Sequence, residues 1–201
     1  KVAFADYEKL RKKKYRKYMA DCVVDDRMAV FESYMGKSYA CSPKAIYQYM
    51  VKSGKFKDFK FVWAFKDMGK LPELILQEPE LANATFVEYG SDAYYKVYAT
   101  AKYFVSNSRL PNYIVKKDDQ IYVQTWHGST FKKLGYDICK EGYNVLSSAD
   151  FLREQYDKDA QRYTYLISPS PFCTGTYQSG FNLAKNNSQV RIIEKGYPRD
   201  D

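Results

Sequence analysis

Short apolar runs alternate with amphipathic stretches over most of this 201-residue chain. The apolar runs favour β-strands, which we expect at 28–34, 57–65, 84–89, 104–107, 120–126, 165–168 and 190–194. Helices are expected at 42–54, 71–77, 91–103, 148–163 and 170–181, with Pro43 at a first helical position and Ser42, Ser91 and Ser148 as N-caps. Strands and helices that alternate in this way pair in parallel through right-handed crossovers. The pattern therefore predicts an α/β fold, a Rossmann-like parallel sheet flanked by helices.

The charge balance predicts an anionic partner, because the formal net charge is +8. Composition alone leaves nucleic acid, phosphorylated substrates and an anionic membrane surface open. The four cysteines show no CxxC spacing and the chain has one histidine, so we expect neither a zinc site nor a disulfide framework. A reducing cytoplasmic compartment is the corresponding expectation. No apolar run approaches the roughly 18 residues that span a bilayer.

The first 24 residues are expected to form a basic helical arm or linker, and residues 25–201 a single domain. The arm contains KLRKKKYRK, from Lys9 to Lys17. This charge run suits a solvated helix face, an anionic bilayer surface or a polyanionic product. The chain starts with Lys1 and stops abruptly after GYPRDD, so we expect it to be a piece of a longer protein.

The only histidine lies in QTWHGSTFKKLG, directly after the strand expected at 120–126. In open parallel sheets, ligands bind beyond the carboxyl ends of the strands, which is where His127 falls. An imidazole suits general-base chemistry on a hydroxyl near neutral pH. The alternative is a histidine packed into the core beside Trp126.

The residues that follow His127 are suited to phosphate. Gly128 allows close approach of the backbone to a ligand, and Ser129 or Thr130 is expected to cap a following helix. A helix start would present free N–H groups, and Lys132 and Lys133 add full charges.

Several separated motifs resemble the CDP-glycerol:poly(glycerophosphate) glycerophosphotransferase family of teichoic acid polymerases and primases. They are FESYMGKSYACSPKAIYQYM from Phe31 onward, Asn107 with Pro111, the block from Lys116 to Asp137, SPSPF at Ser168–Phe172, and GYPRDD at Gly196–Asp201. The resemblance spans roughly residues 28–201. This chain departs from the family pattern mildly, with Ser129-Thr130-Phe131 in place of Thr-Pro-Leu and Asp200 in place of Asn.

The resemblance implies a GT-B-like transferase with two Rossmann-like halves around a cleft. This chain would be the N-terminal, acceptor-side half, and the nucleotide-donor half would lie outside it, which leaves the chain alone catalytically incomplete. The implied reaction transfers glycerol phosphate from CDP-glycerol to a hydroxyl of a lipid-linked poly(glycerol phosphate) acceptor, at the cytoplasmic face of the membrane. His127 would be the general base, and no metal or other cofactor is expected.

Seven further residues are candidates for the same site. Glu32 could orient the imidazole or be an edge-of-strand surface carboxylate. Gly36 and Lys37 form a tight turn with a possible phosphate contact. Asn107 and Arg109 either bind substrate or form a turn. Ser168 and Ser170 either meet phosphate or cap the helix expected at 170–181.

Two alternatives to this function remain. One keeps the fold but uses a ribitol-phosphate donor, or another GT-B transferase reaction. The other, from a different class, is a basic, tyrosine-rich nucleic-acid-binding module, although no RRM, OB, KH or helix-turn-helix signature appears.

Overall fold

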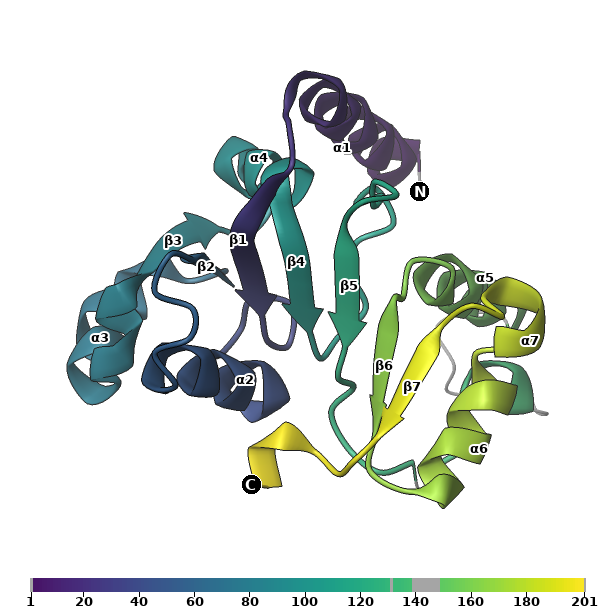
Figure 1. Cartoon of the computed structure of the whole chain (residues 1–201). Helices are drawn as coiled ribbons and strands as arrows, with labels where there is room; N and C mark the ends of the chain where they lie inside the picture. Colours follow the sequence, from purple (N-terminus) through teal and green to yellow (C-terminus); the bar gives the residue numbers. More distant parts are fainter. Residues whose placement is uncertain (1, 131, 139–148, 201) are drawn as a thin grey trace.

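The computed structural model describes residues 2–130, 132–138 and 149–200. Within them a seven-stranded parallel sheet has the order β3-β2-β1-β4-β5-β6-β7 (Figure 1). The strands are β1 Asp25–Glu32, β2 Lys60–Phe65, β3 Ala84–Glu88, β4 Ala101–Ser106, β5 Ile121–Gln124, β6 Tyr165–Ser168 and β7 Arg191–Glu194. The order reverses direction at β1 and β4, so the loops after these two strands open a crevice at the carboxyl edge of the sheet.

Helices or helical turns connect most consecutive strands, as the alternation predicts, whereas irregular chain joins β4 to β5. The helices are α1 Val2–Asp21, α2 Cys41–Lys52, α3 Leu71–Gln77, α4 Asp92–Thr100, α5 Ala149–Ala160, α6 Pro171–Gly180 and α7 Leu183–Asn186. Short 3-10 turns add η1 Met68–Lys70, η2 Pro79–Asn83, η3 Gly135–Asp137 and η4 Pro198–Asp200. The Rossmann-like α/β prediction is confirmed.

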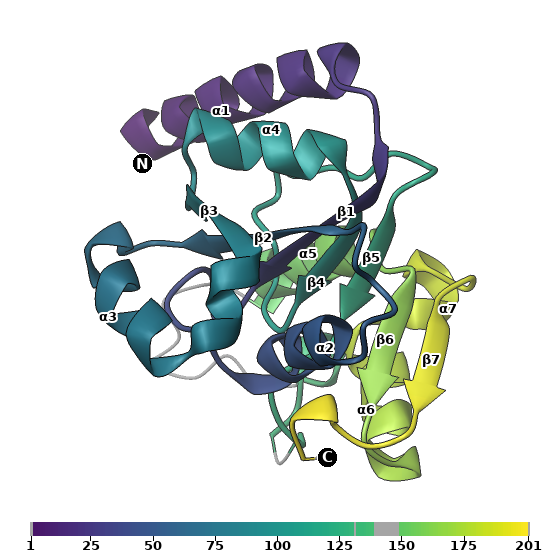
Figure 2. The same ribbon diagram turned by 60° about the vertical axis from the view of Figure 1, so that its left-hand side comes forward.

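Alternation along the central strands sends successive side chains to two separate cores. Val30, Val62 and Phe104 join one cluster with α1, α4 and α6. Phe31 and Trp63 join a second cluster with α2, and their rings stack with centroids 5.4 Å apart. Because both faces are buried, the sheet is covered on each side, as parallel sheets require (Figure 2).

The basic N-terminal segment is helical, but it is not a separate arm. α1 lies along α4 in both views (Figures 1 and 2). Tyr15 is fully buried there, and its hydroxyl donates to the carbonyl of Val115 at 2.8 Å. Lys14 pairs with Asp92 at the start of α4. Tyr15, Tyr18 and Met19 therefore pack the helix onto the domain, while its described lysines are exposed to solvent.

The helix starts agree with the sequence in part. Ser91 caps α4 by accepting from the N–H of Tyr94, as predicted. The prediction for Ser42 is wrong, because α2 begins at Cys41 and the buried Ser42 hydroxyl has no hydrogen-bond partner in the described part of the chain. Ser148 lies outside the described residues.

Candidate active site

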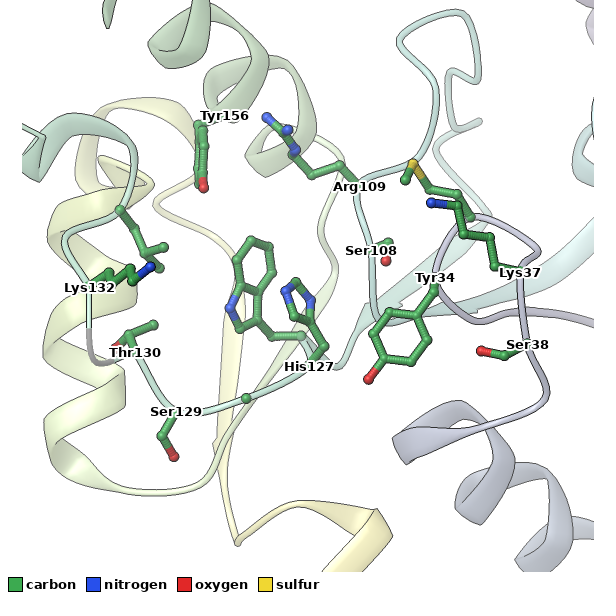
Figure 3. Close-up of a pocket in the computed structure, with 14 residues that line it drawn as sticks. Tyr34, Lys37, Ser38, Ser108, Arg109, His127, Ser129, Thr130, Lys132 and Tyr156 are labelled. Carbon is green, nitrogen blue, oxygen red and sulfur yellow. The ribbon is translucent and has the colours of Figure 1, made fainter. Parts of the chain in front are cut away.

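A pocket of about 910 Å³ opens at the carboxyl edge of β1, β4 and β5 (Figure 3). We call it the His127 pocket. Its described lining is Tyr34, Met35, Lys37, Ser38, Ser108, Arg109, Trp126, His127, Gly128, Ser129, Thr130, Lys132, Leu134 and Tyr156. These side chains come from the loops after β1, β4 and β5 and from α5. Among the described residues that line the pocket none is acidic, so the cations of Lys37, Arg109 and Lys132 favour an anionic ligand.

His127 is exposed at the centre of this pocket (Figure 3). Trp126, which is buried, stacks on its ring with centroids 4.6 Å apart and planes at 27°. Trp126 takes a left-handed backbone conformation, with φ 53°, and its N–H donates to the side-chain oxygen of Gln124 at 2.9 Å. This strained turn sends the indole into the core and the following imidazole outward. The structure thus places His127 at the sheet edge with its ring accessible, as expected from the sequence.

The tautomer of His127 follows from one contact. Its Nδ1 lies 2.7 Å from the backbone carbonyl oxygen of Asn107. A carbonyl only accepts hydrogen bonds, so Nδ1 must carry the proton. In the neutral ring Nε2 then holds the lone pair, which is the form a general base requires.

Asn107 holds two loops of the pocket together rather than facing into it. The residue is fully buried and is absent from the pocket lining. Its side-chain oxygen accepts from the N–H of Tyr34 at 2.8 Å, while its backbone oxygen accepts from His127. The prediction of a substrate contact by its side chain is therefore replaced by a positioning role.

Arg199, from the last sequence motif, braces the other side of the histidine loop. One guanidinium nitrogen donates to the carbonyl of His127 at 3.1 Å and to the Cys41 sulfur at 3.3 Å. Burial alone would raise the pKa of the Cys41 thiol, but hydrogen bonds from Asn107 and Arg199 leave that pKa below its ordinary value. Sequence reasoning did not identify this brace, because the contact joins residues 72 positions apart.

The structure brings together many of the predicted site residues. His127, Gly128, Ser129, Thr130, Lys132, Lys37 and Arg109 all line the pocket. Tyr34, Met35, Ser38, Ser108 and Tyr156 line it too and were not predicted. Position directly after a strand could have indicated the first four, whereas no local signal marks Tyr156 within α5.

Glu32 does not orient the imidazole. It is fully buried, and one of its carboxylate oxygens accepts from the hydroxyls of Tyr94 and Tyr98, at 2.9 and 3.0 Å. Burial raises its pKa to about 7, against the opposing effect of those two hydrogen bonds. The two readings considered from sequence, a histidine partner and a surface carboxylate, are both wrong, because the β1 pleat points this side chain into the core beneath α4.

Four other predicted residues lie away from the pocket lining. Gly36 is buried in a tight turn with φ +75°, where an added Cβ would lie 3.1 Å from the Lys66 nitrogen. Ser170 caps α6 by accepting from the Cys173 N–H, and the Ser168 hydroxyl donates to the Ser170 carbonyl. Lys133 is exposed outside the lining. The structure thus supports the capping alternative for Ser170.

The predicted helix after His127 is also absent from the described residues on either side of position 131. Ser129 and Thr130 stand in irregular chain, and the next described helical turn is η3. Side-chain cations, rather than a helix N-terminus, therefore supply the positive charge of the pocket.

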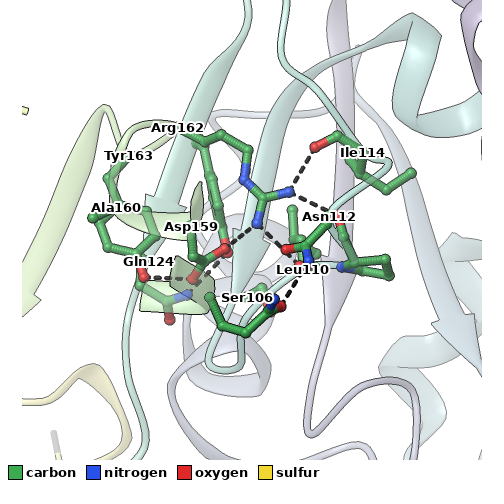
Figure 4. A network of polar contacts seen from close by, with 12 residues as sticks. Ser106, Leu110, Asn112, Ile114, Gln124, Asp159, Ala160, Arg162 and Tyr163 are labelled. Atoms are coloured by element: carbon green, nitrogen blue, oxygen red, sulfur yellow. Dashed lines mark hydrogen bonds and ion pairs between the residues drawn. The ribbon is translucent and has the colours of Figure 1, made fainter. Parts of the chain in front are cut away.

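A buried ion pair holds the loop that follows β4 (Figure 4). The guanidinium of Arg162 donates to the carbonyls of Leu110, Pro111 and Ile114, at 3.0, 2.8 and 2.6 Å. It also pairs with Asp159, whose other oxygen accepts from Tyr163. One side chain thus fixes three carbonyls directly after Arg109, which keeps that cation at the pocket wall.

The described residues contain no group of three or more His, Cys, Asp or Glu side chains placed to hold a metal ion. Cys22, Cys41 and Cys173 are free thiols, and Cys139 lies outside the described residues.

Comparison with known proteins connects this geometry to a family. The profile of the CDP-glycerol:poly(glycerophosphate) glycerophosphotransferases matches residues 14–201. The chain belongs to this glycerophosphotransferase family. The resemblance seen in its motifs is therefore confirmed, and the match includes part of α1.

Relatives of the family share sequence and fold with the chain. It is 36% identical over 180 residues to a teichoic acid poly(glycerol phosphate) polymerase of Staphylococcus epidermidis, covering 89% of this chain and 23% of the relative. A polymerase of the same description from Bacillus spizizenii is 33% identical over 177 residues, covering 88% and 42%. The solved wall teichoic acid polymerase TagF superposes with a TM-score of 0.78 at 32% identity, covering 94% of this chain and 44% of that one. The chain thus spans less than half the length of these glycerophosphotransferases.

Proposed function

We propose that the protein containing this chain transfers glycerol phosphate from CDP-glycerol to the terminal hydroxyl of a poly(glycerol phosphate) acceptor. The His127 pocket is the acceptor side of that reaction. The observation that carries the proposal is the contact of His127 Nδ1 with the Asn107 carbonyl, which leaves Nε2 as the proton-accepting nitrogen in a cationic pocket.

The acceptor oxygen attacks the β-phosphorus of CDP-glycerol, a new P–O bond forms, and the bond from that phosphorus to the CMP oxygen breaks. The acceptor proton passes to His127 Nε2. Such base catalysis contributes about two to four orders of magnitude in rate. Lys37, Arg109 and Lys132 line the pocket and would offset the phosphate charge of the ligands.

The nucleotide of the donor is assigned to the part of the enzyme outside this chain. The chain covers 44% of TagF, and we infer that the remainder of a full-length enzyme supplies the nucleotide-binding unit. The proposed reaction uses no protein-bound metal or other cofactor, because CDP-glycerol is itself the activated substrate.

The experiment is CMP release from CDP-glycerol with a soluble glycerol-phosphate acceptor, in the full-length protein and its His127→Ala variant. We expect turnover to fall about 10²–10⁴-fold while the melting temperature stays close to that of the wild type. Unchanged turnover would remove the base assignment. CDP-ribitol, assayed in parallel, tests the alternative donor.

We also propose a peripheral position at the cytoplasmic face of the membrane, where a lipid-linked acceptor would be met. No helix among the described residues has the length and apolar character to cross a bilayer. Lys9, Lys12, Lys13 and Arg16 are exposed together on α1. Each contributes on the order of 1 kcal/mol near an anionic bilayer. Sedimentation with anionic vesicles, but not with neutral ones, is the expected result.

A further inference from the structure

A second, smaller pocket adjoins the His127 pocket. Its volume is about 350 Å³, and Met35 and Arg109 line both pockets. Arg11 and Glu8 of α1, together with Tyr113, line its far side. We call it the Arg11 pocket. The two pockets share a wall, so a ligand that starts at His127 can continue past Arg109 toward α1.

Arg109 is a cation with one buried hydrogen-bond donor left unused by the described chain. Its Nη1 is buried and has no hydrogen-bond partner within the described residues. Its guanidinium lies 4.9 Å from the Tyr156 ring centroid, on the wall common to both pockets (Figure 3). Asp159, a buried carboxylate that interacts electrostatically with Arg109, already accepts hydrogen bonds from Arg162 and Tyr163. A buried N–H without an acceptor is costly, so this side chain is suited to an anionic ligand that supplies oxygens.

Arg11 supplies a second cation, held in place by aromatic rings. Its guanidinium lies 4.1 Å from the Tyr7 ring centroid and 5.7 Å from that of Tyr113, and it donates to the Tyr7 hydroxyl. Within the described part of the chain it pairs with no carboxylate. Glu8 is the one acidic side chain in the described pocket lining. Two cations against one anion leave the pocket with net positive charge.

We propose that the Arg11 pocket is a second phosphate subsite for the acceptor chain. The terminal hydroxyl lies at His127, the first phosphodiester meets Arg109, and a phosphodiester further along the same chain meets Arg11. This inference rests on the proposed function, and it specifies that the preferred acceptor is a linear polyol phosphate with more than one unit. Arg109 links the two pockets, so a ligand with regularly spaced phosphates can use both.

The test varies acceptor length in the full-length protein. CMP release is measured with soluble glycerol-phosphate acceptors of one to six units for the wild type, Arg11→Ala and Lys185→Ala. Lys185→Ala is the control, because it removes one positive charge, as Arg11→Ala does, from an exposed position on α7 outside both pockets. We expect Arg11→Ala to raise KM for the longer acceptors about 10-fold or more, and to leave KM for the one-unit acceptor and kcat unchanged. Lys185→Ala should match the wild type at every length.

Two results would overturn the subsite. One is a KM for Arg11→Ala that changes equally at all lengths, or at none. The other concerns competition by polyanions. If a single-stranded oligonucleotide inhibits as strongly as a poly(glycerol phosphate) chain of equal charge, and Arg11→Ala weakens both inhibitors equally, the pocket binds any polyanion. Failure of the proposed function looks different, because His127→Ala would then retain CMP release with every acceptor.

Discussion

The Nδ1 atom of His127 lies 2.7 Å from the main-chain oxygen of Asn107. The Asn107 side-chain oxygen accepts a hydrogen bond from the N–H of Tyr34, in the loop after β1. One buried residue thus sets both the tautomer of the imidazole and the position of the facing pocket wall. The bond to His127 uses the backbone, so a substitution at position 107 acts on the histidine only through displacement of the loop.

Asn107→Ala is expected to lower kcat for CMP release about 10²-fold, because small displacements of a catalytic group have effects of that order. The lost hydrogen bond to Tyr34 should also reduce the free energy of unfolding by about 1–3 kcal/mol. Asn83→Ala is the matched control, since Asn83 is an exposed amide outside both pockets whose side chain donates to the Glu80 carbonyl. A kcat for Asn107→Ala equal to that of the control would contradict the positioning role.

Two glycines near the pocket should respond differently to alanine. A Cβ at Gly128 would meet nothing within 4 Å, whereas one at Gly135, with φ +44°, would lie 2.2 Å from the Gly180 carbonyl oxygen. Gly128→Ala should therefore keep the wild-type melting temperature and lower CMP release, because its methyl group enters space that the ligand needs. Gly135→Ala should lower the free energy of unfolding by about 1–3 kcal/mol. Equal melting temperatures for the two variants would show that this distinction is wrong.

Removal of one partner from the Asp159–Arg162 pair should be strongly destabilising, because its side chains are only 1% and 9% exposed and the remaining group would be buried unpaired. Arg162→Met leaves a buried carboxylate and three carbonyls without their donor, and is expected to cost about 3–5 kcal/mol in urea unfolding. The control is Lys158→Met in α5, which removes a solvent-exposed pair with Glu154 and should cost less than about 1 kcal/mol. If both variants lose a similar free energy of unfolding, Arg162 does not hold the loop after β4 in place.

Glu32 should make stability depend on pH. Its pKa is raised to about 7 in the folded protein, from 4.5. A carboxyl with a higher pKa in the folded than in the unfolded state binds its proton more tightly when folded. Its contribution to the free energy of unfolding is therefore complete below pH 4.5 and is lost as the pH rises through 7. Compared with the wild type, Glu32→Gln should gain up to about 3 kcal/mol of unfolding free energy between pH 5 and pH 8. Parallel stability curves for the two proteins over this range would contradict the raised pKa.

The sequence by itself determined the elements whose signals are local. Hydrophobic alternation located the strands, and β6 was predicted at its observed bounds. Ser91 and Ser170 cap their helices as local chemistry suggests. His127 reaches the edge of the sheet because it follows a strand in a parallel fold, which pattern alone establishes.

Tertiary structure decided which side chains meet. Glu32 was considered a partner of His127, yet the pleat of β1 places it under α4, where it accepts hydrogen bonds from two tyrosine hydroxyls. Arg162 contacts carbonyls about 50 positions earlier, and Arg199 reaches the His127 loop from the end of the chain. No local pattern encodes such contacts, because they depend on how the loops pack once the sheet has formed. The strands and caps are local properties of the chain, whereas the imidazole tautomer and the paired pockets exist only in the folded protein.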